Sequence, residues 1–341
     1  MYRPIHPTAA GQGRIGGVDN GVHRDSCNVA LVKDNFAPSG TQPFHTFYYN
    51  RFVTRRKLLT GSAACAATLW ARSHWDRSRI SAITDEIGAT ADDAASFAHD
   101  AGMLFVEVRN QPGSNREYAT SREADMQATA AHLKNESLKV SMVNTSLLKF
   151  AWPGSAAAPD QARWDRRMDD LQKALRCAEI MGADKLRIFA GTRVPDPSSM
   201  FPRIADAIAE MAAECEKQKV TLLLENDPDT NVASCADLAA VMKLMPSKAV
   251  GINWKPAPDG YALLPKKRIL NVRVPAASLA PSRPEFMNWK AILTALDKDG
   301  YAGRITLEMG LTGGKGTDGG KGTDAARDSL DQLVHIVREV S

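Results

Sequence analysis

From residue 79 onward, short apolar runs alternate with longer segments in which apolar residues recur every three to four positions. Each apolar run is predicted to be a buried strand, and each longer segment an amphipathic helix. Strict alternation of strands and helices is typical of parallel strands joined by crossover helices. The predicted strands are 79–84, 104–108, 138–144, 185–190, 220–225, 249–254, 268–274 and 304–308.

The same pattern predicts the architecture of the folded part. Helical periodicity covers residues 91–101, 117–135, 161–181, 202–218, 235–244, 289–298 and 324–340, and Gly102, Gly182 and Gly300 each follow a helix, as glycine commonly does. Eight strand–helix units fit a barrel of about 250 residues. A doubly wound open sheet is the alternative, but no Gly-x-Gly-x-x-Gly motif follows a strand. We therefore predict an α/β protein with a single (β/α)8 TIM barrel over residues 79–341.

The segment before residue 79 has a different composition. Residues 1–52 are rich in Gly, Pro, Asn and His without periodicity, and are predicted to be disordered, or to lie outside the protein if Val53 is the true start. Residues 53–78 contain Thr54-Arg-Arg-Lys-Leu-Leu-Thr60 and a short Ala-rich stretch, which resembles a twin-arginine export signal. A basic N-terminal helix is the alternative. The stretch is too short to span a membrane, so we expect an exported, periplasmic or extracellular protein carried by the machinery for folded proteins.

The distribution of charge and the spacing of the cysteines limit the functions that the chain can have. The first 78 residues carry ten Lys and Arg against four Asp and Glu, a net charge of +6, whereas the rest of the chain has a net charge of −2. Nothing in the predicted barrel therefore indicates nucleic-acid binding. The five cysteines lie far apart and form no metal-binding or redox motif. Cys177 and Cys215 fall in helical segments and are predicted to be buried free thiols.

A hexapeptide, Gly-Gly-Lys-Gly-Thr-Asp, occurs at residues 313–318 and again at 319–324. We interpret this repeat as a flexible loop after the eighth strand. A phosphate cradle before a helix is the alternative, but the spacing of a P-loop is missing.

Two predicted strands end on a carboxylate, Glu225 and Glu308, and the corresponding ends of the two strands between them carry Lys255 and Arg273. The carboxyl ends of barrel strands form the rim of the active site. The two acids and two cations are candidates for proton transfer and charge stabilisation. The alternative is that the four residues form ion pairs with one another at the end of the barrel and have no catalytic role.

Further strand-end residues are candidates for substrate binding. Glu107 and Arg109 share one face of their strand, as pocket residues or as an inward-facing ion pair. Arg187 is a candidate for binding a substrate anion, or for an ion pair with Glu225. The remaining candidates are Lys149 and Asn226 at the rim and Trp254, which would stack on a sugar or simply pack in the core. His99, His132 and His335 fall on helices, so no His-based metal site or Ser-His-Asp triad is predicted.

The ordered strand ends resemble a known family. The segments 80–87, 105–109, 222–226, 250–254 and 305–308 are similar to those of xylose isomerase-like TIM barrels, the sugar phosphate isomerase/epimerase proteins. This resemblance implies a divalent metal held by Glu, Asp, His and Glu on strands five to eight. Glu225 and Glu308 match the first and last ligands, but Lys255 and Arg273 stand where Asp and His are expected. The implied site would bind Mn, Mg, Zn or Co weakly through Glu225 and Glu308, or not at all.

The resemblance implies an isomerase or epimerase that acts on a small carbohydrate or keto-sugar. Glu225 and Glu308 would move the proton, and Lys255 and Arg273 would stabilise the developing negative charge. Two alternatives stay open. One is a non-catalytic carbohydrate-binding or interaction protein on the same barrel, and the other is a lyase or hydrolase of modified sugars.

Overall fold

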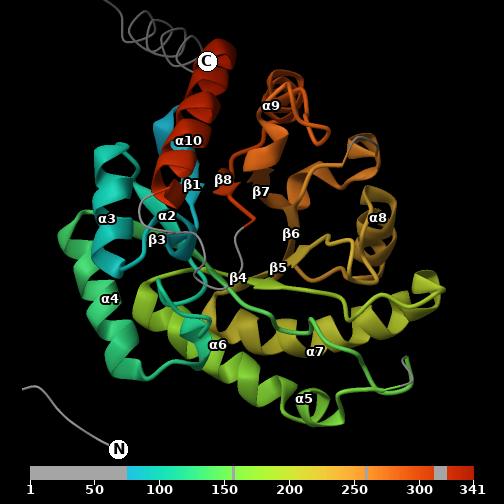
Figure 1. Ribbon diagram of the computed structural model, residues 1–341. Coiled ribbons are helices and arrows are strands. Elements are labelled where there is room, and N and C mark those ends of the chain that lie inside the picture. The colour runs from blue at the N-terminus through green and yellow to red at the C-terminus, as the bar shows by residue number, and fades with distance from the viewer. Residues whose placement is uncertain (1–74, 156–157, 258–259, 311–320) are drawn as a thin grey trace, which may run out of the picture. The chain divides into compact units, whose positions relative to one another are not determined.

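Eight parallel strands form a nearly closed barrel with helices around it (Figure 1), as the sequence pattern predicts. The computed structural model describes residues 75–155, 158–257, 260–310 and 321–341, which belong to one compact unit. The strands are β1 (Ile80–Ala82), β2 (Phe105–Val108), β3 (Lys139–Asn144), β4 (Lys185–Ile188), β5 (Thr221–Glu225), β6 (Val250–Trp254), β7 (Ile269–Pro275) and β8 (Arg304–Glu308). All eight predicted strands are confirmed.

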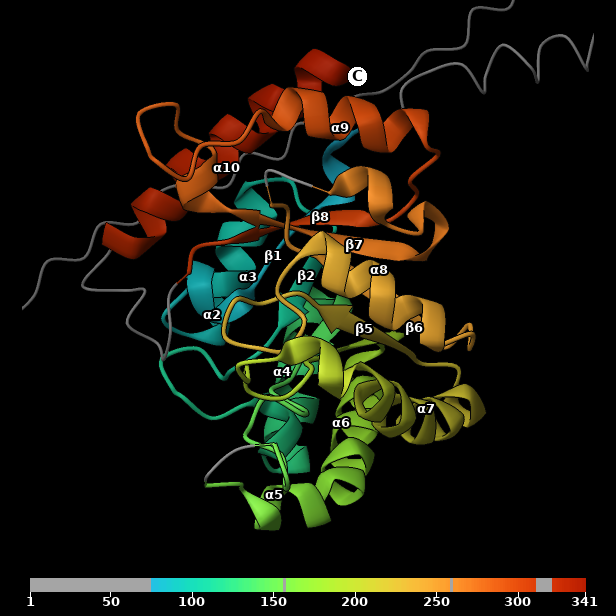
Figure 2. The ribbon, with the colours of Figure 1, turned by 90° about the vertical axis from the view of Figure 1, so that its right-hand side faces the viewer.

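Helices follow most of the strands and form the outer layer. They are α2 (Thr84–Ile87), α3 (Ala91–Asp100), α4 (Glu123–Asn135), α5 (Gln161–Asp165), α6 (Arg167–Met181), α7 (Phe201–Gln218), α8 (Cys235–Leu244), α9 (Trp289–Lys298) and α10 (Lys321–Val340). Short 3-10 turns are η1 (Arg77–Arg79), η2 (Tyr118–Thr120), η3 (Pro197–Met200), η4 (Tyr261–Leu263), η5 (Lys266–Arg268) and η6 (Ala276–Ser278). In Figure 2, α9 and α10 lie side by side over β1, β7 and β8. No helix in the described ranges is long and apolar enough to cross a membrane.

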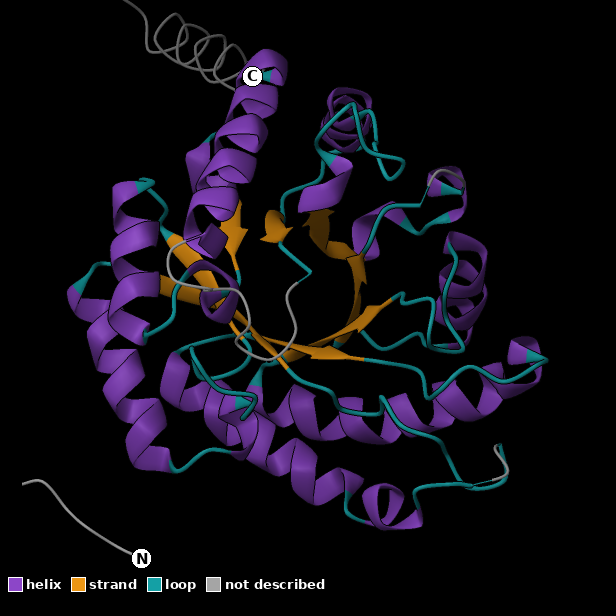
Figure 3. Ribbon diagram, in the orientation of Figure 1, coloured by secondary structure: helices purple, strands orange, loops and turns teal. Residues whose placement is uncertain are grey.

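The sheet runs in the order β1-β8-β7-β6-β5-β4-β3-β2, so the barrel must close between β1 and β2. At this seam one isolated parallel bridge joins Ile83 to Glu107. Figure 3 shows the strands as a ring inside the helices. Because all strands are parallel, their carboxyl ends open at one face of the ring, which we call the barrel mouth.

Local sequence signals set the helix boundaries. Thr90 and Ser234 each cap a helix through a reciprocal capping box, with Asp93 and Asp237 at the third helical position. Gly102, Gly182 and Gly300 have φ angles of +66°, +68° and +72°, the left-handed conformation that ends a helix at low cost. The predicted role of these glycines is confirmed.

Three expectations need correction. The segment predicted as one helix over 161–181 is interrupted at Arg166, which separates α5 from α6. The connection from β6 to β7 has the turns η4 and η5 and no α-helix in its described residues. Lys321 begins α10, so the end of the hexapeptide repeat is helical and not a loop. The rest of the repeat, like the predicted leader and most of the predicted export signal, lies outside the described residues.

The core contains the expected buried thiols and two buried tryptophans. Cys177 and Cys215 are buried and free, and burial raises the pKa of each thiol to about 12. Trp152 and Trp289 are also buried, each with its indole N–H donated to a protein oxygen. These side chains therefore pack the core, and none of the four offers a surface to a ligand.

The first described residues, 75–79, pack against the barrel through a set of contacts that we call the clasp. Trp75 is buried and donates its indole N–H to the carbonyl oxygen of Leu293 at 3.2 Å. The guanidinium of Arg79 lies over the rings of Trp75 and Tyr301, at 4.6 and 5.3 Å from their centres. Its Nε donates to the carbonyl oxygen of Gly303 at 2.6 Å. Residues 75–79 thus belong to the packed unit.

We predict that Trp75→Ala lowers the free energy of unfolding by about 3–5 kcal/mol, because it removes a large buried ring and leaves a cavity. Urea unfolding of the purified protein measures this change. The matched control is Phe286→Ala, which removes an exposed aromatic ring and should change stability by less than about 1 kcal/mol. Equal effects of the two substitutions would contradict the clasp.

Candidate functional site

Seven strands bring polar side chains into the barrel mouth. Strand alternation turns every second side chain inward, and the inward positions near the carboxyl ends are polar in an otherwise apolar interior. They are Glu107 on β2, Asn144 on β3, Arg187 on β4, Glu225 on β5, Asn253 on β6, Asn271 and Arg273 on β7, and Thr306 and Glu308 on β8. All of them are buried.

Arg273 lies at the centre of this group and is fully buried. Its Nη1 lies 2.5 Å from Glu107 Oε2, its Nε lies 3.1 Å from Glu225 Oε2, and its Nη2 donates to Asn144 Oδ1. Burial alone would lower the pKa of Arg273, but the carboxylates of Glu107, Glu225 and Glu308 outweigh it and raise the pKa. The guanidinium is therefore a permanent positive charge inside the barrel.

Glu107 is held from several sides as the counter-ion of Arg273. Its carboxylate accepts hydrogen bonds from Asn144 at 2.8 Å, Asn271 at 3.1 Å and the hydroxyl of Thr306 at 2.6 Å. The side chain is completely buried. This predicted substrate-binding residue therefore neutralises Arg273 and is not exposed to a ligand. Glu107 and Arg109 do not pair with each other: Glu107 pairs with Arg273, and Arg109 pairs with Asp85 and Glu86.

Glu225 is the second counter-ion. Besides Arg273, it accepts a hydrogen bond from Asn253 at 2.5 Å and lies 3.6 Å from Nη1 of Arg187. The ion pair of Arg187 with Glu225 was one of the two predicted interpretations, and it forms. Only 2% of the Glu225 side chain is exposed, so a ligand would reach this carboxylate after some movement of its neighbours.

The second strand-end pair, Glu308 with Lys255, lies nearer the solvent. Lys255 Nζ is 2.8 Å from Glu308 Oε2, and 31% and 10% of the two side chains are exposed. Burial alone would raise the pKa of Glu308, but Lys255 and Arg273 lower it to about 2. Burial likewise opposes a charged Lys255, yet Glu308 raises its pKa. Both groups are therefore ionised at neutral pH, and Lys255 is not suited to attack a carbonyl as a neutral amine.

A cluster that the sequence analysis missed lies where β1, β2 and β8 meet. Arg109 Nη2 is 2.8 Å from Asp85 Oδ2, and its Nη1 is 3.1 Å from Glu86 Oε1. Glu86 Oε2 also accepts the backbone N–H of Met309 at 2.8 Å. Burial raises the pKa of Glu86 to about 7; Arg109 opposes the shift and Glu308 adds to it. Asp85 and Glu86 lie in the segment 80–87, which is one of those that resemble the known family. Two adjacent acids directly after the first strand were therefore the sequence signal that could have located this cluster.

Two other predicted residues, Lys149 and Asn226, take structural positions. Lys149 pairs with Asp227 at 2.9 Å and lies over the ring of Phe189. The amide of Asn226 donates to the carbonyl oxygen of Lys255 and accepts its N–H, so it joins the ends of two strands.

Trp254 does not lie in the mouth. It is buried, donates its indole N–H to Cys235 Sγ at 3.3 Å and stacks on Tyr261. Because strand alternation turns its neighbour Asn253 inward, Trp254 faces the outer helices, and its predicted stacking on a sugar in the mouth has no support in this position.

The donor set does not fit a divalent cation. Among the four positions where the resemblance implies ligands, Lys255 and Arg273 offer no lone pair while protonated. The guanidinium of Arg273 also lies between Glu107 and Glu225, where a metal would need carboxylate oxygens. Within the described residues no group of three or more His, Cys, Asp and Glu side chains is arranged to hold a metal ion.

Comparisons with solved structures show the same fold at low identity. A probable 3-DHS dehydratase from Bacillus anthracis is 16% identical with a TM-score of 0.56, covering 75% of this chain and 98% of its own. The IOLI protein with a bound zinc atom is 12% identical with a TM-score of 0.59, covering 77% and 99%. L-ribulose 3-epimerase is 18% identical with a TM-score of 0.58, covering 77% and 96%. A search of the curated proteins finds no match.

The family comparison agrees with the resemblance seen in the strand ends. The family described as Xylose isomerase-like TIM barrel matches residues 95–257, which run from α3 to the residues just after β6. Together with the eight-stranded architecture, this match assigns the fold: the chain is a TIM barrel, and its residues 95–257 are similar to the xylose isomerase-like TIM barrel family.

Proposed function

We propose that the barrel mouth binds a small carbohydrate or keto-sugar and transfers a proton at the carbon next to its carbonyl group, as an isomerase or epimerase does. The observation that carries this proposal is the Lys255–Glu308 pair, a base and a cation 2.8 Å apart and partly exposed at the mouth. Such chemistry needs a base for the proton and a positive charge for the developing enediolate. Solved relatives in fold include an L-ribulose 3-epimerase, which is consistent with this class of reaction.

The ion pair itself suggests how Glu308 gains basicity. With a pKa of about 2, Glu308 is a weak base while it is paired with Lys255. A substrate carbonyl oxygen that binds Lys255 would draw the ammonium group away from Glu308. The pKa of Glu308 would then rise, because Lys255 is its strongest charged partner. Lys255 would stabilise the negative charge on the oxygen while Glu308 takes the proton.

Arg273 and Glu225 would lie behind the Lys255–Glu308 pair and would not contact the substrate in the arrangement seen here. Both are almost fully covered, so we assign Arg273 the role of a fixed positive charge beneath the substrate. Glu225 would serve as the second carboxylate only if its bonds to Arg273 and Asn253 loosen on binding. This covering is also the observation that favours the alternative, a carbohydrate-binding protein without turnover.

Export is a further part of the proposal and rests on the sequence at Thr54–Thr60. Cleavage before Trp75 would leave the clasp intact, since Trp75 is packed against the barrel. N-terminal sequencing of the protein recovered outside the cytoplasm would test this, and a start at residue 80 or later would contradict it.

We predict that the purified protein exchanges the C–H proton next to the carbonyl of a ketose for deuterium in D2O, and that Glu308→Gln slows this exchange by about 10²–10⁴-fold, because the base is lost. Proton NMR over a panel of ketoses and keto-sugars measures the exchange directly. Lys255→Met should slow it as well, whereas the exposed control Glu285→Gln should not.

The assay is run with a chelator and with added Mn²⁺, and the exchange is expected to persist under both conditions. Exchange that requires Mn²⁺ would overturn the assignment of charge stabilisation to Lys255. Binding of a sugar without exchange by the unmodified protein would favour the carbohydrate-binding alternative. Elimination or cleavage products in the same spectra would favour the lyase or hydrolase.

The raised pKa of Glu86 makes stability depend on pH in a defined direction. Between the ordinary value of 4.5 and about 7, the unfolded chain has released this proton while the folded protein still holds it. The free energy of unfolding should therefore fall as the pH rises through this window, by up to about 3 kcal/mol from this group. Urea unfolding at several pH values from 5 to 8 measures the slope.

Glu86→Gln should flatten this decline, because an amide does not titrate and still accepts the N–H of Met309. The charged groups around position 86, namely Asp85, Arg109 and Glu308, remain in the variant. Glu285→Gln, an exposed substitution, is the control and should keep the slope. The same slope in Glu86→Gln as in the unmodified protein would refute the assignment.

A further inference from the structure

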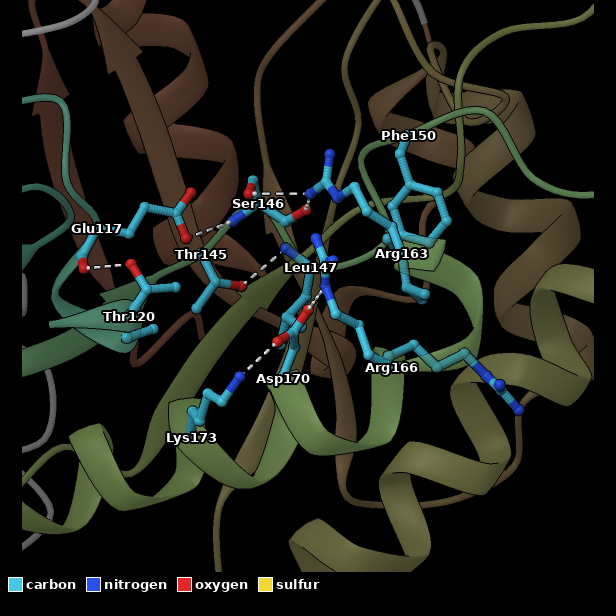
Figure 4. Close-up of a pocket in the computed structure, with 13 residues that line it drawn as sticks. Glu117, Thr120, Thr145, Ser146, Leu147, Phe150, Arg163, Arg166, Asp170 and Lys173 are labelled. Carbon is cyan, nitrogen blue, oxygen red and sulfur yellow. Dashed lines mark hydrogen bonds and ion pairs between the residues drawn. The ribbon is translucent and has the colours of Figure 1, made fainter. Parts of the chain in front are cut away.

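A cavity of about 560 Å³ lies beside the carboxyl end of β3, away from the central ion pairs of the mouth. Its walls come from η2, from residues 145–150 after β3, and from α5 and α6 (Figure 4). None of Glu225, Glu308, Lys255 and Arg273 lines it. A cavity of this size is in the range that holds small ligands.

The lining of this cavity carries more positive than negative charge. The cations are Arg163, Arg166, Arg167 and Lys173, and the carboxylates are Glu117 and Asp170. Arg167 is paired with Glu210, outside the cavity, at 2.6 Å. The other three cations face two carboxylates, so one positive charge remains in excess.

Arg163 is one of the cations that have no carboxylate of their own among the residues described. Its guanidinium donates to the carbonyl oxygens of Lys149 and Ser146 and to the hydroxyl of Ser146 at 3.3–3.4 Å. These contacts are longer than ordinary hydrogen bonds of 2.7–3.2 Å. In the described part of the chain Arg163 forms no ion pair with a carboxylate. A bidentate anion would give it shorter, charge-assisted bonds.

Asp170 holds two cations near the opening of the cavity. Arg166 Nε lies 3.2 Å and Lys173 Nζ lies 3.1 Å from its carboxylate oxygens, and 52% and 56% of the two side chains are exposed. One carboxylate neutralises one of these cations. The other is available to a second anion at the cavity mouth.

Glu117 and Ser146 add hydrogen-bond acceptors next to Arg163. Glu117 Oε2 accepts the N–H of Ser146 at 3.3 Å (Figure 4), and its carboxylate forms no ion pair among the described residues. Carboxylate and hydroxyl oxygens in such a position bind the hydroxyl groups of a ligand. The cavity thus offers both cations and hydrogen-bond acceptors to one ligand.

One residue that lines the cavity is held in an unusual backbone conformation. Leu148, which lines the cavity, has φ = +65°, a region that a bulky residue rarely adopts. Its carbonyl oxygen accepts the N–H of Gly191 and the indole N–H of Trp152, at 2.9 and 3.1 Å. Backbone of this kind persists where the surroundings hold it, and it is concentrated at functional sites.

We propose that this cavity is a second ligand site, for a hydroxylated anion such as a sugar phosphate or sugar acid. The phosphate or carboxylate group binds Arg163 and the cations beside Asp170, and the hydroxyl groups bind Glu117 and Ser146. The site is independent of the proposed reaction in the barrel mouth.

The test is isothermal titration of the folded protein with glucose 6-phosphate, inorganic phosphate and glucose, at constant ionic strength. Glucose 6-phosphate is expected to bind best and glucose to bind at least about tenfold more weakly, because charge-assisted bonds are lost. Inorganic phosphate should lie between them, since it leaves Glu117 and Ser146 unused. Phosphate that binds as tightly as the sugar phosphate would overturn the role of the hydroxyl groups.

Arg163→Gln and Lys173→Gln should each weaken binding of glucose 6-phosphate, Arg163→Gln by about tenfold or more. Lys173 is exposed, and among the described residues it forms an ion pair with Asp170 alone. Lys173→Gln should therefore fold normally, so the test can be read even if Arg163→Gln does not fold. Arg122→Gln, at another exposed ion pair, is the matched control and should bind like the unmodified protein.

Lys255→Gln separates the two sites. It changes the mouth and should leave the affinity for glucose 6-phosphate at the second site unaltered. Loss of binding in Lys255→Gln with full binding in Arg163→Gln would place the anion in the mouth and overturn the proposal. Equal binding by Arg163→Gln, Lys173→Gln and the unmodified protein would do the same.

Discussion

A guanidinium without access to water has to be neutralised by its surroundings, and Arg273 imposes this constraint on the whole barrel interior. Moving a charge out of water costs several kcal/mol unless ion pairs and hydrogen bonds compensate for it. Glu107, Glu225 and Asn144 come from three other strands to do so. The packing of the barrel and the placement of its carboxylates therefore depend on one another.

This constraint also separates the mouth into two levels. In the lower level Arg273 and its counter-ions are buried and joined by ion pairs and hydrogen bonds, so this part of the mouth should be rigid. In the upper level Lys255 and Glu308 form a single pair that solvent can reach. A positive charge thus stands on β7 where the resemblance implies a metal-binding histidine. The charge is part of the chain and does not depend on the supply of a metal.

Much of this structure could be predicted from the residue pattern. The eight strands follow from local apolar runs, and the positions of Glu225, Lys255, Arg273 and Glu308 follow from where these runs end. The partners could not be predicted in the same way. Which inward side chains meet depends on the stagger of the strands and on how the ring closes.

Particular residues show where prediction from the sequence ends. Arg109 was a candidate partner of Glu107, its neighbour on the strand, but it pairs across the seam with Asp85 and Glu86. Trp254 was a candidate for the mouth, but side-chain alternation turns it outward. The cavity around Arg163 had no sequence signal, because its walls come from segments that are remote from each other along the chain.

The sequence by itself determined the strands, the helices with their caps and glycine ends, and the order of acids and bases along the strand ends. These features depend on periodicity and on neighbours within a few residues. The tertiary structure alone decided which charges are paired, how deeply each is buried and therefore how its pKa is shifted. Burial and Coulomb interactions act between residues that are far apart in sequence, as between Glu107 and Arg273 on β2 and β7.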